Sequence, residues 1–223
     1  MQADFRHELM LARSAKYLCD TDKTPDIVIN YNRAALEHSL KGLTDFTLSD
    51  SEVMYTSYKF YDALPDFGGF MLHSSAVAVD NKAYLFSALS GTGKSTHTQQ
   101  WVKLFGERAC IINDDKPAIM VEDGGIFACG TPWSGKSDMN MNVKVPLQGI
   151  CVLERSAENF IRPLDQGTAV FKILNQTMRS DSPEKMNKLL DLLDMVIKRV
   201  PVWRMGCNIS TQAAQVAYDA MSE

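Results

Sequence analysis

The feature that most constrains this chain is a glycine-rich octapeptide between an expected strand and an expected helix. Residues 88–95 have the sequence ALSGTGKS; they follow the apolar run 83–88 and precede a segment that we expect to be helical to about Phe105. The P-loop pattern G-x-x-x-x-G-K-[ST] differs from this stretch only in its first position, which is Ala88 here. Alanine is small enough for the tight turn, so the sequence predicts an α/β fold built around a strand–loop–helix unit.

This octapeptide also predicts a ligand. Glycines let backbone N–H groups approach phosphates, and a helix N-terminus adds partial positive charge at the same place. Lys94 would reach the β- and γ-phosphates, and the Ser95 hydroxyl would bind Mg²⁺. We therefore expect ATP, or another nucleoside triphosphate, with magnesium, against the alternative of a turn that binds nothing. The predicted nucleotide contacts are Ser90, Gly91, Thr92, Gly93, Lys94, Ser95 and Thr96.

Two adjacent carboxylates, Asp114 and Asp115, end the apolar strand candidate 110–113. Neighbouring side chains that leave a strand point to opposite sides, so one carboxylate could hold metal while the other accepts a proton from a hydroxyl. We predict Ser95 and Asp115 as metal ligands, and Asp114, Asp115 and Lys94 as catalytic residues. His73, just before the first hairpin, is either structural or a further catalytic group.

Two further segments leave alternatives open. In the loop 130–142, Trp133 and Lys136 could form an exposed substrate surface and a phosphate contact, or Trp133 could pack on the core. His97 lies in the first turn of the expected helix, where it would either touch phosphate or lie on the surface.

Composition excludes several classes of protein. The 223 residues carry a net charge of −4, without the basic surplus of a general nucleic-acid binder. We find no signal peptide and no run of the ~18 apolar residues that a membrane span needs, so we expect no membrane contact and a cytoplasmic protein. The five cysteines form no C-x-x-C pair, which favours buried free thiols.

Periodicity predicts the remaining elements. We expect a mixed succession of short strands and helices, with residues 1–70 as an N-terminal α/β segment packed on a core formed by residues 71–223. The expected strands are 26–31, 75–79, 83–88, 110–113, 118–121, 126–129 and 149–153, and the expected helices are 51–64, 95–105, 168–178, 183–199 and 211–221.

Three blocks of the chain resemble the superfamily of HPr kinase/phosphorylase and ATP-dependent phosphoenolpyruvate carboxykinase. They are LHSSA at 72–76, LSGTGKST at 89–96 and NDD at 113–115, in the order and spacing of that superfamily. The rest of the chain, including TPWSGK at 131–136, looks like small HPr-kinase-like proteins.

The resemblance implies an α/β fold with a mixed, α+β-like sheet: a carboxykinase/HPr-kinase-like P-loop core with flanking helices. It implies that His73 and one aspartate lie near the metal or the transferred phosphoryl group. In HPr kinase an aspartate of the pair is the base for a serine hydroxyl, and in the carboxykinases the histidine and second aspartate bind metal. Both assignments stay open for Asp114 and Asp115. A homo-oligomer is a further implication of the resemblance.

These observations favour a kinase that transfers the γ-phosphoryl group of ATP to a hydroxyl of a serine-containing protein or peptide, or of a small metabolite. The chain is less than half a carboxykinase in length and matches no HPr-docking region, which argues against both parent reactions. The alternatives are a carboxykinase-type lyase, with a carboxylate pocket from Arg155, Arg162 or Arg204, and a non-catalytic nucleotide sensor.

Overall fold

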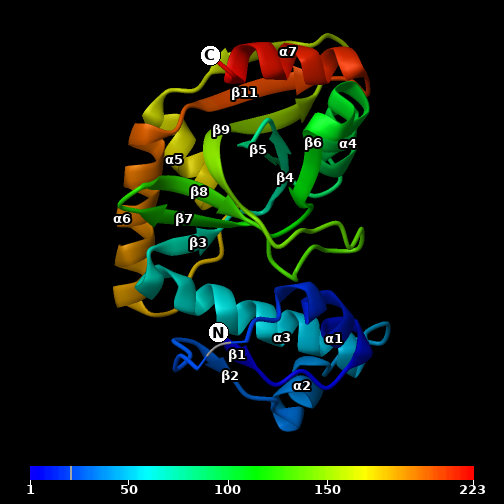
Figure 1. The fold of residues 1–223 in the computed structure, drawn as a ribbon, viewed down its shortest axis with the longest axis vertical. Helices are drawn as coiled ribbons and strands as arrows, with labels where there is room; N and C mark the ends of the chain where they lie inside the picture. The colour runs from blue at the N-terminus through cyan, green and yellow to red at the C-terminus, as the bar shows by residue number, and fades with distance from the viewer. Residues whose placement is uncertain (21) are drawn as a thin grey trace.

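The chain folds around one curled sheet of mixed strand direction with helices on both faces (Figure 1). The structure is a computed structural model that describes residues 1–20 and 22–223. Within these residues nine strands belong to the sheet, and their pairings include both parallel and antiparallel neighbours. The predicted mixed α/β architecture is therefore confirmed.

The sheet has the order β3-β7-β8-β9-β5-β4-β6, with β11 beside β9 and β10 beside β11. The strand bounds are β3 (Gly69–Met71), β4 (Ser74–Val79), β5 (Lys82–Ser87), β6 (Ala109–Asn113), β7 (Ala118–Glu122), β8 (Gly125–Cys129), β9 (Lys144–Arg155), β10 (Phe160–Pro163) and β11 (Val202–Cys207).

Strand β9 organises the functional edge of this sheet. Its first residues pair antiparallel with β8, and its later residues pair parallel with both β5 and β11. Because β5, β9 and β11 are parallel, their carboxyl ends at Ser87, Arg155 and Cys207 meet at one edge. Ligands of open α/β sheets bind outside the carboxyl ends of strands.

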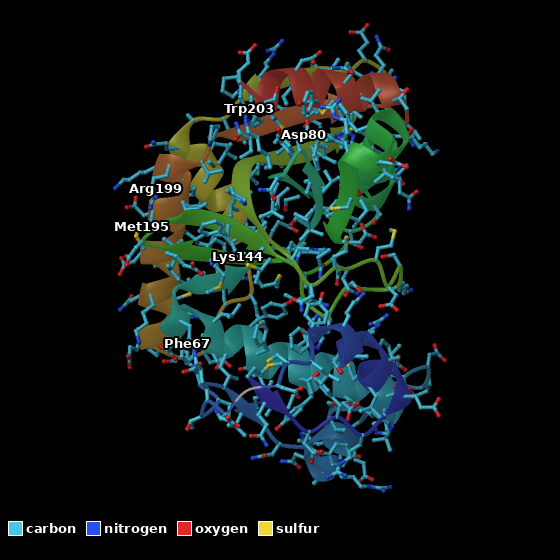
Figure 2. The ribbon with its side chains drawn as sticks, in the orientation of Figure 1. Phe67, Asp80, Lys144, Met195, Arg199 and Trp203 are labelled. Carbon is cyan, nitrogen blue, oxygen red and sulfur yellow. The ribbon has the colours of Figure 1, made fainter. Side chains whose placement is uncertain are left out.

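Two pairs of helices bury the two faces of the sheet. Helices α4 (Lys94–Phe105) and α7 (Thr211–Met221) cover one face, where Trp101 packs with Tyr84 and Phe86. Helices α5 (Gln166–Leu174) and α6 (Pro183–Arg199) cover the other through residues such as Ile173 and Leu193. Met195 points outward from α6 and is 39% exposed (Figure 2).

The N-terminal residues form a layer of their own below the sheet in Figure 1. It contains the parallel pair β1 (Gln2–Ala3) and β2 (Val28–Ile29), and helices α1 (Glu8–Ser14), α2 (Arg33–Ser39) and α3 (Leu48–Ala63). The short 3-10 helices are η1 (Ala15–Tyr17), η2 (Leu64–Phe67) and η3 (Gly106–Arg108). The domain boundary at residue 70 stays a prediction; β3, which spans it, pairs with β7 of the large sheet.

Local signals located the core elements well. Both predicted hairpins are present, and the first turns through Asp80 and Asn81, whose φ angles of 49° and 60° suit a two-residue hairpin loop. The helix expected at 168–178 ends at Leu174, and α1, α2, β1, β3, β10 and β11 were not predicted. The five cysteines, all described, carry free thiols. Over the described ranges, no helix has the length and apolarity needed to cross a membrane.

Candidate functional site

The glycine-rich loop joins the end of β5 to the start of α4, as the sequence predicted. Gly91 and Gly93 have φ angles of 77° and 119°, the left-handed region that glycine adopts without strain. A Cβ atom at either glycine would meet nothing within 4 Å, so this stretch of backbone faces open space. A ligand can therefore approach the main chain directly at the positive end of the α4 dipole.

Lys94 is the first residue of α4, and its side chain lies back across the loop. Its Nζ atom donates a hydrogen bond to the carbonyl oxygen of Ala88 at 3.1 Å, and the residue is 8% exposed. Burial lowers the pKa of Lys94, whereas the charges of Asp115 and Asp114 act in the opposite direction. The ammonium group is thus held by the Ala88 carbonyl oxygen with two carboxylates nearby.

Asp114 is directed toward α4. The Ser75 hydroxyl lies 2.6 Å from Asp114 Oδ1, to which it donates, and 2.7 Å from Thr98 Oγ1. Thr98 is on the second turn of α4, one turn after Ser95, and Asp114 is 6% exposed. The buried carboxylate is therefore fixed against the helix that carries the magnesium-ligand candidate Ser95.

Asp115 is directed toward His73 and Lys116. His73 Nε2 is 3.2 Å from Asp115 Oδ1, and Lys116 Nζ is 2.8 Å from Oδ2. Burial alone would raise the pKa of Asp115, but the hydrogen bond from His73 and the charge of Lys116 outweigh it and lower the pKa to about 2. The Asp115 carboxylate is therefore ionised at neutral pH.

The turn that presents both carboxylates is built by Asn113, whose side chain is fully buried. Its Oδ1 accepts hydrogen bonds from the backbone N–H groups of Asp115 (2.9 Å) and Lys116 (2.7 Å). Its Nδ2 donates to the carbonyl oxygen of Thr131 at 2.9 Å. Asn113 thus fixes the aspartate turn and attaches it to the start of the loop 130–142.

That loop covers the aspartates and is held by the N-terminal layer. A Cβ atom at Gly135, where φ is 69°, would lie 3.0 Å from the Asp115 Cβ atom, so the backbone of Gly135 approaches the Asp115 side chain closely. The side chain of Arg13, 8% exposed, donates to the Gly135 carbonyl oxygen at 2.7 Å and pairs with Asp138 at 2.9 Å. Tyr17 donates to Asn140 Oδ1 at 2.8 Å.

Two side chains near the site are more buried than an exposed role allows. Trp133 is 1% exposed, stacks on Phe60 and donates to Thr56 Oγ1, so it is a core residue and its interpretation as an exposed binding surface was wrong. His97 is 3% exposed and accepts a hydrogen bond from Trp101 Nε1, so the surface alternative was wrong there too. Burial lowers the pKa of His97 to about 4.

The remaining predicted residues gather around one pocket of about 420 Å³, called the phosphate pocket below. Thr92 lies outside its lining and faces the two neighbouring pockets. The structure shows this proximity, and the roles of the residues stay predictions. The predicted residues that line it are His73, Ser90, Gly91, Gly93, Lys94, Ser95, Thr96, Asp114, Asp115 and Lys136.

The donor set of the phosphate pocket fits magnesium better than a transition metal. Among the described residues, no three His, Cys, Asp or Glu side chains are grouped as a ready-made metal site. Mg²⁺ is usually held by one or two carboxylates, with substrate phosphates and water completing its coordination. Ser95 and the two aspartates supply oxygen ligands of that kind.

Several residues that shape the site were not predicted. Gln176, whose Oε1 is 3.2 Å from His73 Nδ1, comes from the segment after α5, 103 positions along the chain, and has no sequence signal. Arg13 also has none, whereas Ser75 lies within the block 72–76 that carries the family resemblance. Asn113 could have been found, because an asparagine before a polar turn commonly accepts hydrogen bonds from the N–H groups that follow.

Comparisons with known proteins identify a family. No curated protein matches the chain. Among solved structures it is similar to the Hpr(Ser) kinase/phosphatase from Coxiella burnetii, with 10% sequence identity, a TM-score of 0.39, and coverage of 67% of this chain and 95% of that one. That likeness is too weak to assign a fold or an activity, so membership in the HPr kinase and carboxykinase superfamily stays a prediction. The model for "SynChlorMet cassette protein ScmC" matches residues 42–215. Because this match spans well over half of the chain, the protein belongs to the ScmC family.

Proposed function

We propose that this ScmC-family protein is a magnesium-dependent phosphotransferase that moves the γ-phosphoryl group of ATP to a hydroxyl. One observation carries the proposal: a glycine loop with open backbone, a buried lysine and two carboxylates on opposite sides surround the phosphate pocket. A purely structural turn would need neither carboxylate. A non-catalytic nucleotide sensor would need the loop and the lysine alone.

The two carboxylates divide the work in this proposal. Asp114 is tied through Ser75 and Thr98 to α4, so it is the aspartate better placed to bind metal together with Ser95. Asp115 has the His73 ring beside one of its oxygens and the Lys116 ammonium beside the other, which leaves less room for a metal ion. We therefore assign Asp115, with His73 behind it, to the acceptor hydroxyl, in place of its predicted metal role. The bound Mg²⁺ would supply neutralisation of phosphate charge.

The reaction is an in-line displacement. The acceptor oxygen forms a bond to the γ-phosphorus, the bond from that phosphorus to the β–γ bridging oxygen breaks, and ADP leaves with the electron pair. The hydroxyl proton passes to Asp115. A carboxylate with a pKa of about 2 is a weak base, but phosphoryl transfer has a loose transition state and depends mainly on positioning and charge neutralisation. Orienting the hydroxyl is the larger part of the role of Asp115.

The nucleoside would lie beyond the start of α4. A pocket of about 600 Å³ there is lined by the loop glycines, Thr96, Asn208 and Ile209, which is 78% exposed and offers apolar surface for a base. The Lys94 ammonium group, which reaches back to Ala88 at the start of the loop, would then contact the γ-phosphate, close to Asp115.

Calorimetric titration with MgATP tests the proposal. Lys94→Ala should weaken binding by about 10- to 100-fold, because a hydrogen-bonded charge pair with phosphate is lost. Lys103→Ala, in the last turn of the same helix and exposed, is the matched control and should bind as the wild type does. Failure of the wild type to bind ATP, ADP, GTP or pyrophosphate would overturn the proposal. Tight binding without transfer to any hydroxyl would instead support a sensor.

A further inference from the structure

A second pocket lies on the other side of the glycine loop from the phosphate pocket. It has a volume of about 390 Å³, within the usual range for small-molecule sites, and we call it the α5 pocket. Its walls are the carboxyl ends of β5 and β9, residue Arg204 of β11, and the last turn of α5. It therefore occupies the edge of the sheet at which ligands of α/β proteins bind.

The α5 pocket opens at the γ-phosphate end of the loop. Ala88 lines it, and the carbonyl oxygen of Ala88 accepts the hydrogen bond from Lys94 Nζ at 3.1 Å. Lysine at this position of a P-loop contacts the β- and γ-phosphates. The pocket therefore adjoins the expected γ-phosphate position across the start of the loop.

Two hydrogen bonds connect the α5 pocket to His73, which in turn contacts Asp115. Gln176 lines the pocket, and its Oε1 lies 3.2 Å from His73 Nδ1, while Nε2 of the same ring faces Asp115. Ser87 also lines the pocket and donates to the carbonyl oxygen of His73 at 3.0 Å. The wall between the two pockets is therefore made of residues that position His73.

The charge of the α5 pocket favours an anion. Of the described residues that line it, Arg155, Lys172 and Arg204 are cationic and Glu154 alone is acidic. Glu154 pairs with Arg204 at 2.9 Å, and Arg155 donates to the Gly91 carbonyl oxygen at 2.5 Å. Lys172, at the end of α5, has no hydrogen-bond or ion-pair partner among the described residues, so its charge is available to a ligand.

Apolar surface completes the lining. Leu89 is 75% exposed, although leucine is usually buried, and it stands at this pocket together with Val152, Leu153 and Leu164. A ligand with a short carbon chain would cover this surface, and its anionic group would meet Lys172 and Arg204.

We propose that the α5 pocket binds the phosphoryl acceptor, and that this acceptor is a small hydroxy acid whose carboxylate is recognised by Lys172 and Arg204. The inference rests on the proposed phosphotransferase function and names its substrate class. The carbon chain of the acid would extend past the start of the loop, so that its hydroxyl reaches the phosphate pocket, which Lys94 and Asp115 line. There the hydroxyl oxygen bonds to the γ-phosphorus, ADP leaves with the electron pair of the broken bond, the proton passes to Asp115, and the product is a phosphorylated hydroxy acid.

The test offers the wild-type protein MgATP and a panel of hydroxy acids of three to six carbons, each paired with its own amide. Phosphate transfer and calorimetric binding are measured for every pair. We expect at least one acid to be phosphorylated at least tenfold more efficiently than its amide, because a charge-assisted contact is lost in the amide.

Lys172→Gln should raise KM for that acid by about tenfold and leave MgATP affinity unchanged. Lys103→Gln is the matched control, since both lysines are exposed in the last turn of a helix. Absence of MgATP binding would remove the proposed function itself. With MgATP bound, three results would overturn the inference alone: equal use of acids and amides, equal KM in Lys172→Gln, or no acid bound in the panel. Phosphorylation of a serine peptide with amidated carboxylates, unaffected by Lys172→Gln, would also overturn it.

Discussion

The two loops that face each other across the phosphate pocket are built in opposite ways. The glycine loop is held mainly by its own neighbours in sequence, since β5 precedes it, α4 follows it and Lys94 donates a hydrogen bond back to Ala88. Arg155 adds one distant contact, to the Gly91 carbonyl oxygen. The loop 130–142 is held from far away, with Arg13 contacting Gly135 across 122 positions of the chain. A site can therefore combine one wall that is encoded locally with one whose position depends in part on the N-terminal layer.

This difference gives the N-terminal layer a role at the site. Arg13 lies on α1 and Tyr17 on η1, the next element of the chain. Both contact the loop that brings Lys136 to the phosphate pocket. Lys16 adds a hydrogen bond to the carbonyl oxygen of Asn140 at 2.7 Å. Loss of these contacts should misplace Lys136 while leaving the glycine loop intact.

The largest effect is expected at Asp115, where the two walls meet. Asp115→Asn should lower turnover by about 100- to 1000-fold, since general-base and orienting groups contribute on that scale, and should leave MgATP affinity within a few-fold of the wild type. Steady-state transfer rates and calorimetry measure the two quantities separately. Asp123→Asn, in the turn between β7 and β8, is the control. Undiminished turnover in Asp115→Asn would remove its assignment to the acceptor hydroxyl.

The same carboxylate gives a stability test that needs no substrate. Because the pKa of Asp115 is lowered from 3.8 to about 2 by folding, its ionised form stabilises the native state above pH ~4, and this contribution is lost as the pH falls toward 2. The shift corresponds to roughly 2 kcal/mol. Urea unfolding of the wild type and Asp115→Asn should differ most near neutral pH and converge in acid. A constant difference down to pH ~2 would contradict the hydrogen bond with His73 and the ion pair with Lys116.

The sequence predicted the local wall and missed what holds the other. Residues 88–95 carry their own signal, because glycines, a lysine and a helix start fall within eight positions. The aspartate pair also carries a local signal, because two adjacent carboxylates end the apolar strand candidate 110–113. Gln176 and Arg13 could not be predicted, because in the sequence both look like ordinary surface residues. Only the fold brings Gln176 to His73 and Arg13 to Gly135. The sequence left open whether Trp133 is exposed or buried, because burial of a loop tryptophan depends on partners such as Phe60, 73 positions away.

A smaller effect is expected from the distant anchor. Arg13→Gln should lower turnover by about tenfold, because misplacing a group near the reaction by about 1 Å can cost that much or more, while MgADP binding to the glycine loop stays unchanged. Arg6→Gln is the matched control, since Arg6 lies in the same layer but pairs on the surface with Asp4. If MgADP affinity fell in parallel with turnover, the N-terminal layer would support both walls and the contrast between them would fail.

The smallest effect is expected at Lys136, which is exposed and acts as a single solvated charge. Lys136→Gln should raise KM for MgATP by about threefold, the size of a contact between exposed charges. The Lys136→Gln substitution is most informative when it is combined with Arg13→Gln and KM of the double variant is measured. If Arg13 positions Lys136 as well as the groups that set turnover, adding Lys136→Gln to the Arg13→Gln variant should change KM no further, whereas independent contributions to KM would multiply. A multiplicative result would mean that Arg13 holds Asp115, through Gly135, and not Lys136. The predicted loss of turnover in Arg13→Gln would then trace to the acceptor hydroxyl and not to the phosphate.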